Sequence, residues 1–455
     1  MIKRWTALAA VLMLCLAVPV VAQTEEPEMD PLLELLVEQG VITAEQASAV
    51  QAEYARREAA KAGATTSTEV VSVDAPMVAA TEVVPIEATS PQLADAQPAA
   101  QPDAAPARAK WYDKIDFKGD LRFRYEGFWI DGLSDNNHRS RFRLRARAGA
   151  YTDVTDWMKV GLQLRSGDPL DPVSDNQSVD TGFSMKQIAM SEAYAAFDAT
   201  NWLDIRAGKF DPKGLWTVSD LMWDDDVTVE GLLENVEFGA FQANLYQFFL
   251  EERRGGDDSN LYGGQVQGAF DIGSRHSLKV GAAYDDWVNP QYVADLTLSG
   301  KLHGNRVTNI LDDENQLISD FQIGSFFAEW KYKLSDRWPI KVTAFGYHNF
   351  GANEYDGKKY DDGYFIRFQI GDYKKPGQIA LRASRYYSQP DALFYVFTQS
   401  DTTMVSDVDG YRFDLRLGFI MKSYFNFTWY HTKPASDLKD VPTMDRLQVD
   451  YIIKF

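Results

Sequence analysis

Arginine occupies every second position from Arg139 to Arg147, and the residues between these arginines are mostly apolar. Because side chains alternate sides along a β-strand, this spacing places the guanidinium groups on one face, roughly 6 to 7 Å apart. Like charges packed this closely repel each other unless water or counter-anions lie among them. Such a strand fits the wall of a water-filled membrane barrel, and it also fits a soluble sheet with a solvated arginine face.

A second basic strand is expected directly before this arginine ladder. Arg122 and Arg124 lie on one face of it together with Asp120 and Glu126, and hairpin pairing places that face beside the ladder. We therefore predict one cationic wall made of six arginines: Arg122, Arg124, Arg141, Arg143, Arg145 and Arg147. Arg139 borders the first external loop and is not assigned to this wall.

Carboxylates are expected on the same strand faces as the arginines, which leaves a second interpretation of the cationic wall open. Asp120 and Glu126 accompany the arginines of the first strand, and Asp414 and Asp450 lie on inward faces of later strands. If these groups neutralise the arginines, the wall selects nothing. The sequence does not decide between the two interpretations.

Alternating segments from residue 111 to residue 455 predict an all-β fold. We expect sixteen strands, which begin near Lys114, His138, Trp157, Met185, Trp202, Asp226, Val236, Ser259, His276, Ser319, Trp338, Asp361, Gly377, Asp409, Ser423 and Thr443. Short turns and long loops alternate between these strands, which is typical of a barrel with both termini in the periplasm. Aromatic residues make up 13% of the chain, as interfacial girdles require. The predicted fold is a 16-stranded antiparallel transmembrane β-barrel.

The third long loop, at residues 210–226, combines apolar and acidic side chains. Leu215, Leu221 and Met222, with two tryptophans, are too apolar for a loop that only contacts water. In sixteen-stranded general porins, which this layout resembles, the third long loop folds into the lumen and narrows it. The resemblance implies a constriction whose aspartates face the arginine wall, formed by Trp216, Asp220, Trp223, Asp224, Asp225 and Asp226. A surface calcium site is the alternative, but the EF-hand spacing is absent.

The last expected strand ends on an aromatic residue. Tyr451, Ile453 and Phe455 share one face of it, opposite Asp450 and Lys454. A chain that ends in this way resembles bacterial outer-membrane barrels, whose terminal aromatic residue is recognised by the barrel assembly machinery. We therefore predict that Tyr451, Ile453 and Phe455 form an assembly signal, although an edge strand of a soluble sheet would look similar.

The N-terminal residues 1–22 are predicted to be a signal peptide. Lys3 and Arg4 precede an apolar stretch, and Ala22 suits cleavage before Gln23. The only cysteine, Cys15, lies in this segment, so the mature chain contains no disulfide and no thiol-bound metal. After residue 22, no apolar run approaches the ~20 residues that a membrane-spanning helix requires.

Two further segments precede the barrel. Residues 23–61 predict a periplasmic helical hairpin, in which Thr43 and Gln46 form a capping box, and this hairpin is expected to form a coiled coil or to bind a partner. Residues 62–110 are rich in Ala, Pro and Thr, and this composition predicts a disordered linker. The predicted domains are thus 1–22, 23–61, 62–110 and 111–455.

One stretch resembles a particular protein family. Residues 208–211 (Gly-Lys-Phe-Asp), Trp216, residues 219–221 (Ser-Asp-Leu), residues 223–224 (Trp-Asp) and residues 230–231 (Glu-Gly) are similar to the putative porin family of bacterial outer membranes. Members of that family also begin with a short leucine-rich periplasmic helical segment. The resemblance implies an outer-membrane localisation with the N-terminal region in the periplasm.

These features favour a passive diffusion channel for small hydrophilic solutes or ions, with an anion preference. No cofactor or metal is expected, and similarity to general porins implies a homotrimer embedded in outer-membrane lipid. The alternative is a structural protein whose N-terminal helices tether the membrane to the cell wall or to a periplasmic partner. Deletion of residues 23–110 separates the two functions, because only a tether needs them.

Two other classes of function are disfavoured. The five histidines are accompanied by no nucleophile motif, so we do not expect an enzyme. The formal net charge of −20 disfavours nucleic-acid binding, since the phosphate backbone is repelled by an acidic protein.

Overall fold

The computed structural model describes residues 114–131, 138–180, 182–402 and 404–455. Its strands are β1 (Asp116–Ile130), β2 (Arg139–Thr155), β3 (Met158–Ser166), β4 (Gln177–Ser178), β5 (Ile188–Thr200), β6 (Leu203–Phe210), β7 (Val229–Phe238), β8 (Phe241–Glu251), β9 (Ser259–Ile272), β10 (His276–Val288), β11 (Phe321–Lys333), β12 (Pro339–Asn349), β13 (Asp362–Gly371), β14 (Ile379–Ser388), β15 (Val408–Gly418), β16 (Ser423–Lys433) and β17 (Met444–Lys454). Helix α4 (Pro290–Leu298) and a 3₁₀ helix (Tyr395–Phe397) lie in two of the long loops. The predicted signal peptide, helical hairpin and linker lie outside the described residues.

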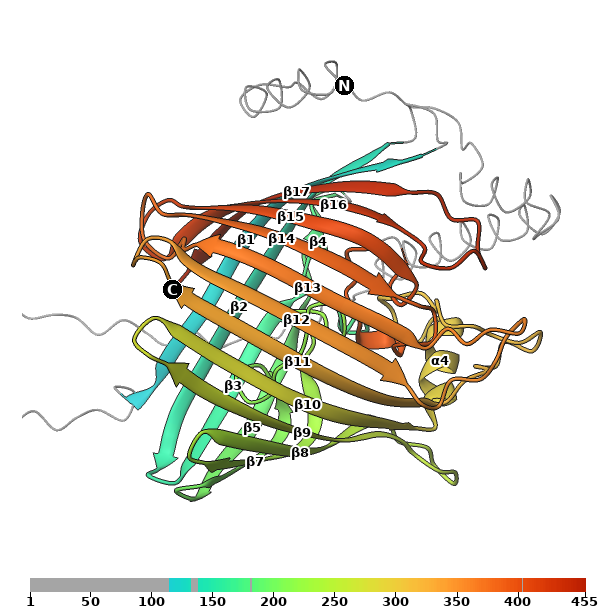
Figure 1. Ribbon diagram of the computed structural model, residues 1–455, viewed down its shortest axis with the longest axis horizontal. Coiled ribbons are helices and arrows are strands. Elements are labelled where there is room, and N and C mark those ends of the chain that lie inside the picture. The colour runs from blue at the N-terminus through green and yellow to red at the C-terminus, as the bar shows by residue number, and fades with distance from the viewer. Residues whose placement is uncertain (1–113, 132–137, 181, 403) are drawn as a thin grey trace, which may run out of the picture. The chain divides into compact units, whose positions relative to one another are not determined.

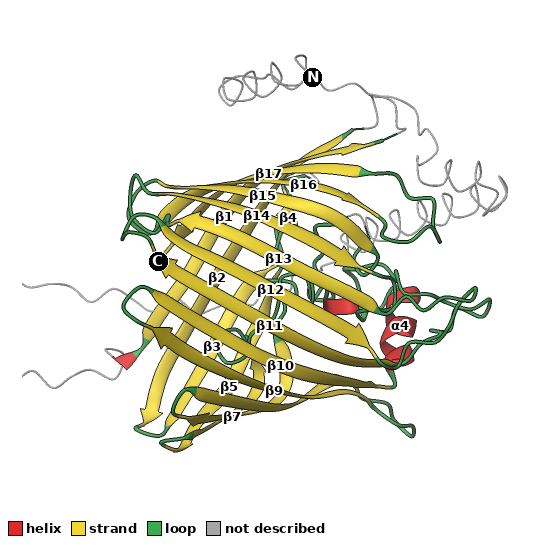
Figure 2. Ribbon diagram, in the orientation of Figure 1, coloured by secondary structure: helices red, strands yellow, loops and turns green. Residues whose placement is uncertain are grey.

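The strands form one closed antiparallel barrel, which Figures 1 and 2 show from the side. Each strand pairs with its neighbour along the chain, and β1 pairs with β17 to close the sheet. The two-residue strand β4 pairs only with β2, beyond the end of β3, so the barrel wall consists of sixteen strands. The predicted all-β, 16-stranded fold is confirmed.

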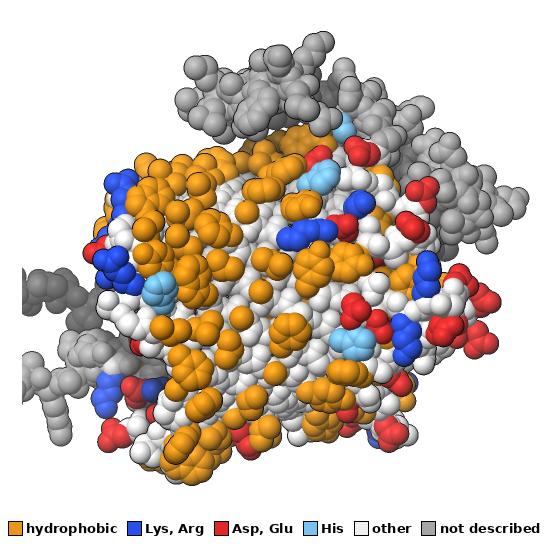
Figure 3. Space-filling view, in the orientation of Figure 1, with side chains coloured by type: hydrophobic (Ala, Val, Ile, Leu, Met, Phe, Trp, Pro, Cys, Tyr) orange, Lys and Arg blue, Asp and Glu red, His pale blue; other side chains and the backbone are white. Residues whose placement is uncertain are grey.

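The alternation of side chains explains why these segments form a barrel. Phe123 and Phe142 point outward, with 54% and 62% of their surface exposed, while their neighbour Arg124 is buried. Figure 3 shows that hydrophobic side chains cover much of the outer face of the barrel. An apolar exterior around a polar interior is the pattern that a membrane barrel requires. Among the described residues, no helix has the length and apolarity needed to cross a membrane.

The connections between strands alternate in length as predicted. Short turns join β2 to β3 and β5 to β6, whereas long loops follow β3, β6, β10 and β14. One predicted boundary is wrong, because Val236 lies inside β7 and the next strand begins at Phe241. The reason is a tight turn at Gly239, whose φ of 61° suits glycine and pairs Phe238 with Phe241.

The apolar core lies inside the barrel, where the long loops pack on the inner wall. The cluster includes Trp216, Leu221 and Trp223 from the third long loop and Phe394 from the seventh, which meet strand residues such as Phe248. Figure 1 shows α4, from the fifth long loop, at the end of the barrel that carries these loops. The lumen therefore contains folded chain as well as the inward-facing polar side chains.

Candidate functional site

The six predicted wall arginines lie on the paired strands β1 and β2. In the pairing of β1 with β2, Arg122 lies opposite Arg145, and Arg124 lies opposite Arg143. All four side chains face the lumen, and each exposes only a small fraction of its surface. Four guanidinium groups at two adjacent cross-strand positions need counter-charges or water between them.

Carboxylates from the strands provide part of this compensation. Arg145 Nη2 lies 2.6 Å from Asp120 Oδ1, and Arg124 Nε lies 2.6 Å from Asp450 Oδ1. Glu126, which is fully buried, accepts a hydrogen bond from Arg141. Asp414 Oδ1 lies 2.8 Å from Nη2 of Arg412, an arginine of β15. All four carboxylates named in the alternative interpretation therefore neutralise arginines.

The third long loop adds two further carboxylates to this side of the lumen. Asp226 pairs with Arg147 and, at 3.2 Å, with Arg145. Asp220 pairs with Arg367 of β13 and lies 3.5 Å from Arg412. Two of the four predicted aspartates thus contact the basic face of the lumen, as expected for a loop folded inward.

The other two predicted aspartates line the same charged cavity as the wall arginines, but their closest partners lie elsewhere. Asp224 Oδ2 accepts hydrogen bonds from the backbone N–H and the hydroxyl of Ser400, at 3.0 and 2.9 Å. The side chain of Asp225 is 77% exposed and lies 3.9 Å from Lys213. The reason is geometric, because successive residues of a tight loop point in different directions and cannot all face one wall.

Burial and charge shift the pKa values of two loop aspartates in opposite directions. Burial raises the pKa of Asp224 well above its usual value, and the nearby carboxylates of Asp226 and Asp401 raise it further. Burial also acts to raise the pKa of Asp226, but Arg147 and Arg145 outweigh it and hold that pKa well below its usual value. The arginines therefore favour the charged form of Asp226, whereas burial disfavours the charged form of Asp224.

The third long loop spans the lumen and is fixed to the opposite wall as well. The backbone N–H of Thr217 donates to Gln265 Oε1 at 2.7 Å, and Thr217 Oγ1 donates to Gln267 Oε1 at 2.8 Å. The carbonyl of Leu215 accepts from Asn244 Nδ2 at 3.0 Å. Side chains of β8 and β9 thus hold one end of the loop, while the arginines hold its aspartates.

The predicted tryptophans of the loop are buried rather than exposed to the lumen. Trp223 stacks on Phe397 of the seventh long loop, with ring centroids 5.3 Å apart and ring planes at 5°. Trp216 packs edge-on against Tyr246 of β8, at a centroid distance of 5.0 Å. These rings anchor the loop by apolar packing and do not form a contact surface for solutes.

Sequence reasoning missed the seventh long loop, residues 389–407, as a second part of the constriction. Asn305 Nδ2 donates to the carbonyls of Tyr395 and Thr398, at 2.9 and 2.8 Å, and Asn309 Nδ2 donates to the carbonyl of Leu393 at 2.9 Å. The backbone N–H of Asp224 donates to the carbonyl of Phe397 at 2.8 Å, which joins the two loops.

The seventh long loop also reaches the basic wall through Asp401. Its carboxylate lies 2.6 Å from Arg446 and 4.0 Å from Arg124. Burial acts to raise the pKa of Asp401, but these two guanidinium groups lower it more, and the net pKa lies well below the usual range. Arg446, from the strand that closes the barrel, therefore lies beside the wall arginines and shares Asp401 and Glu126 with them.

Two more lumenal arginines, Arg382 and Arg416, were not among the predicted site residues. Arg382 Nε donates to Gln369 Oε1 at 2.6 Å. Arg416 donates to Asn426 Oδ1 at 3.1 Å and to the hydroxyl of Tyr373 at 3.0 Å. Their alternation with apolar residues along β14 and β15 is the sequence signal that could have placed them in the lumen.

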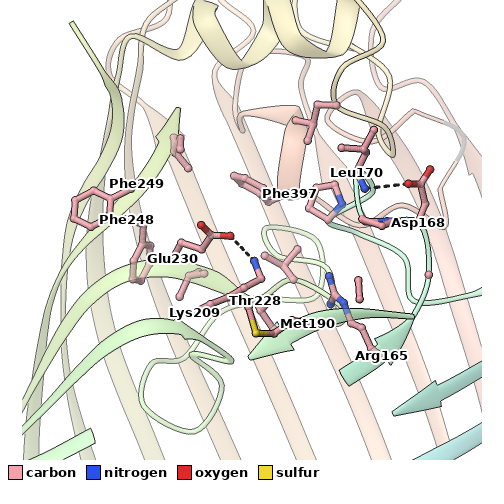
Figure 4. A pocket seen from close by; sticks show the side chains of 18 of the residues that line it. Arg165, Asp168, Leu170, Met190, Lys209, Thr228, Glu230, Phe248, Phe249 and Phe397 are labelled. Atoms are coloured by element: carbon pink, nitrogen blue, oxygen red, sulfur yellow. Dashed lines mark hydrogen bonds and ion pairs between the residues drawn. The ribbon is translucent and has the colours of Figure 1, made fainter. Parts of the chain in front are cut away.

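Two cavities lie beside the constriction. One, of about 290 Å³, is lined by wall arginines and by Asp226, Asp401 and Asn176. The other, of about 220 Å³, is mostly apolar, and Figure 4 shows Phe248 and Phe397 around it, with Lys209 and Glu230 paired at one side. The charged cavity is the one that water and polar solutes can occupy.

The predicted assembly residues lie on the strand that closes the barrel. Tyr451 and Ile453 are paired with Phe123 and Leu121 of β1. Phe455 exchanges two backbone hydrogen bonds with Gly119, both of 3.1 Å. The C-terminal aromatic residue therefore sits at the seam between the first and last strands.

One known protein family matches part of the chain. Residues 128–297 match the family described as putative porin, and this segment contains the whole motif stretch quoted above. The barrel is similar to OprB of Pseudomonas putida, with 12% identity and a TM-score of 0.49 over 76% of this chain and 95% of that chain. It is also similar to a porin variant of Rh. blastica, with 12% identity and a TM-score of 0.43 over 75% of this chain and 100% of that chain.

A search of curated protein sequences finds no match to this chain. The family match over residues 128–297 and the closed barrel support an outer-membrane channel. The predicted resemblance to the putative porin family is confirmed over residues 128–297.

Proposed function

We propose that the chain is a passive diffusion channel for small hydrophilic solutes or ions and that this channel prefers anions. The observation that supports the preference is the set of arginines whose hydrogen bonds go to uncharged groups. Arg382 and Arg416 have amide or hydroxyl partners. Arg143 donates to the hydroxyl of Ser174 at 3.2 Å and to the carbonyl of Asn176 at 2.9 Å, whereas its nearest carboxylate, Glu126, is 4.0 Å away.

Neutral partners fix a guanidinium group without cancelling its charge. Arg122 shows the same arrangement, because Asn176 Oδ1 accepts its hydrogen bond at 2.6 Å, whereas its nearest carboxylate, Asp226, is 3.8 Å away. The neutralised arginines hold the two loops in place, and the arginines with neutral partners are left to attract anions. Field lines are focused by low-dielectric walls, so even a few unpaired charges bias ion flux.

The constriction limits the solutes to small polar ones. Arg and Asp side chains line the charged cavity on facing surfaces, and ordered water between them must be replaced by the solute. An apolar solute cannot make these hydrogen bonds, so it is rejected, while a dipolar solute is oriented by the field. No cofactor takes part in such diffusion, which is driven by the solute gradient.

The test is a double variant, Arg382→Gln with Arg416→Gln, in planar bilayers with a KCl gradient. We expect its reversal potential to shift toward cation selectivity relative to the unmodified channel. The matched control is Arg385→Gln, because Arg385 lies on the same strand but faces outward and pairs with Asp409. An unchanged reversal potential in the double variant would exclude these arginines as the source of selectivity.

We also propose a homotrimer in outer-membrane lipid, as similarity to general porins implies. Mass measurement of the detergent-solubilised protein, with subtraction of bound detergent, distinguishes a trimer from a monomer. Tyr451, Ile453 and Phe455 are proposed as the signal for the barrel assembly machinery. Deletion of Phe455 is expected to reduce the amount of protein inserted into the outer membrane without changing its synthesis.

We propose, as a second function, that residues 23–110 tether the outer membrane. In this proposal the helical segment, residues 23–61, lies in the periplasm and binds the cell wall or a periplasmic partner. It rests on the sequence alone. Deletion of residues 23–110 is expected to detach the membrane from the cell wall and to leave conductance unchanged, since the barrel contains the channel.

A further inference from the structure

A group of potential metal ligands lies on the outside of the barrel, away from the lumen. His348 of β12 is paired directly with Asp362 of β13, and His348 Nδ1 lies 2.8 Å from Asp362 Oδ1. Asp361, the residue before β13, brings a second carboxylate to the same place. One ligand atom from each of these three residues lies within 4.8 Å of the others.

The surroundings of the Asp361 carboxylate favour a bound cation. Asp361 exposes only 8% of its surface, and its side chain has no hydrogen-bond or ion-pair partner within residues 114–131, 138–180, 182–402 and 404–455. Carboxylates with so little exposure normally have hydrogen-bond or ion-pair partners. A cation held between Asp361, Asp362 and His348 would supply such a partner.

The donor set selects the class of cation. One imidazole nitrogen with two carboxylate oxygens suits Zn²⁺, which takes nitrogen and oxygen ligands at roughly 2.0 to 2.2 Å and leaves a fourth position open. Mg²⁺ and Ca²⁺ prefer sites made entirely of oxygen, so the imidazole of His348 disfavours them. The pattern therefore indicates a transition-metal ion rather than an alkaline-earth ion.

The donors are accessible from outside the barrel. A groove lined by Gly324, Gly346 and Tyr364 reaches His348 and Asp362, and the rings of Phe350 and Phe326 lie over the two glycines. The side chains of His348 and Asp362 are 41% and 68% exposed. Figure 3 shows histidine and acidic side chains side by side on the outer face of the barrel. An ion reaches this place without entering the lumen.

We propose that His348, Asp361 and Asp362 bind one divalent transition-metal ion of the Zn²⁺ class on the outer surface of the barrel. A second outward pair offers an internal comparison. His431 Nδ1 lies 3.0 Å from Asp445 Oδ1, also between paired neighbouring strands, but no third ligand joins them among the described residues. The presence of Asp361 therefore distinguishes His348 from His431 as a metal ligand.

The test uses the full chain, purified in detergent and freed of metal, with Zn²⁺ titrated by calorimetry. We expect one tightly bound ion per chain, whose binding is lost in His348→Gln and weakened in Asp361→Asn. Loss of an outer-shell partner already weakens metal affinity by about 10 to 100-fold, so loss of a ligand weakens it by at least that amount. The control, His431→Gln, binds as the unmodified chain does.

Folding and the lumen are checked in the same samples. Far-ultraviolet circular dichroism must be unchanged in each variant, and Co²⁺ in place of Zn²⁺ is expected to give a strong visible absorption band when it is bound in a tetrahedral site. If Asp361→Asn and His348→Gln bind Zn²⁺ like the unmodified chain, or if His431→Gln loses as much affinity, the proposal is wrong. Reversal potentials are expected to be equal in all three variants, because the ion lies outside the channel.

Discussion

Asp226 is the residue on which the position of the third long loop most depends. It accepts hydrogen bonds from Arg145 and Arg147 and from the backbone N–H of Asp175, at 3.1 Å for the last. Because the residue is buried, removal of its charge leaves Arg145 and Arg147 with one carboxylate partner each, Asp120 and Asp175. One side chain therefore joins the loop, the second long loop and the basic wall.

The substitution Asp226→Asn is expected to lower the free energy of unfolding by about 3 kcal/mol, the order found when one partner of a buried ion pair is removed. Single-channel conductance is expected to rise, because the loop is released from the wall. The control is Asp225→Asn, since Asp225 is exposed and makes no contact with the wall arginines. Equal conductance and stability in the two variants would show that Asp226 does not hold the loop.

Asp171, on the second long loop, gives a titration close to neutral pH. Burial raises its pKa to about 6, and Arg143 only partly opposes this. As the pH rises from 5 to 7, Asp171 ionises and adds a negative charge near the wall. We expect the reversal potential in a KCl gradient to shift toward cations with a midpoint near pH 6. Asp171→Asn is expected to abolish this shift, and a shift that persists in the variant would assign it to another group.

The sign of the stability effect of Asp171 follows from the same pKa. The carboxyl binds its proton more tightly in the folded chain than in the unfolded chain, so its contribution to stability is complete below the unfolded value of 3.8. That contribution is lost as the pH rises through 6.

At the scale of elements, the constriction consists of two loops that support each other. Trp223 and Phe397 stack between them, and the N–H of Gln399 donates to the carbonyl of Leu221 at 3.2 Å. The pKa values of Asp220, Asp226 and Asp401 are all held below the usual range by arginines that outweigh the effect of burial. Ion pairs on both loops thus persist through neutral and mildly acidic pH.

Strong acid is expected to release both loops. For a carboxylate with a lowered folded pKa, the stabilisation is present above the unfolded pKa and is lost as the pH falls through the folded pKa. Because arginines hold the folded pKa values well below the usual range, this stabilisation begins to fall only below about pH 4, and we expect conductance to rise at still lower pH. The titration of Asp171 near pH 6 is separate. The measurement is single-channel conductance from pH 7 down to about pH 2, and a conductance that falls in acid would contradict this account.

The seam of the barrel depends on a glycine. A Cβ atom at Gly119 would lie 2.3 Å from the carbonyl oxygen of Arg147 and 2.6 Å from the ring of Phe455. Gly119→Val is therefore expected to prevent closure and to reduce the fraction of folded barrel, measured by resistance to unfolding in unheated SDS. Gly256→Val serves as the control, because only Arg253 Cβ lies near that position, at 3.9 Å. Equal folded fractions would mean that the seam tolerates a side chain.

Alternation along the chain predicted most of the barrel, because lipid outside and water inside impose opposite polarity on successive residues. The ladder from Arg139 to Arg147 shows this most clearly, and it forms the middle of β2 as expected. Val236 was misassigned because a turn of two residues at Gly239 interrupts two strands of similar composition. Local patterns thus locate strands better than they locate tight turns.

Loop contacts were less predictable, because they join residues far apart in the sequence. The carbonyls of the seventh long loop are held by Asn305 and Asn309, about 90 residues earlier, and nothing in their local sequence indicates those partners. The same limit applies to Asp224, whose partner Ser400 lies on that loop. Apolar composition identified the third long loop as buried, and the apolar run at residues 392–397 was a comparable signal in the seventh that was not used.

For the whole molecule, the central claim is that a closed barrel carries anions past two inward-folded loops. The wall that was predicted to be a uniform cationic surface is instead divided between arginines paired with carboxylates and arginines paired with neutral groups. Only the second set supports selectivity, so the preference for anions is expected to be moderate rather than strict. High salt is expected to weaken it, because mobile ions screen these charges.

The most direct test of this claim is the reversal potential of the purified full-length protein in a planar bilayer with a KCl gradient. The account predicts stepwise single-channel currents and a reversal potential displaced toward that of Cl⁻. The absence of conductance, or a reversal potential displaced toward that of K⁺ at neutral pH, would contradict it.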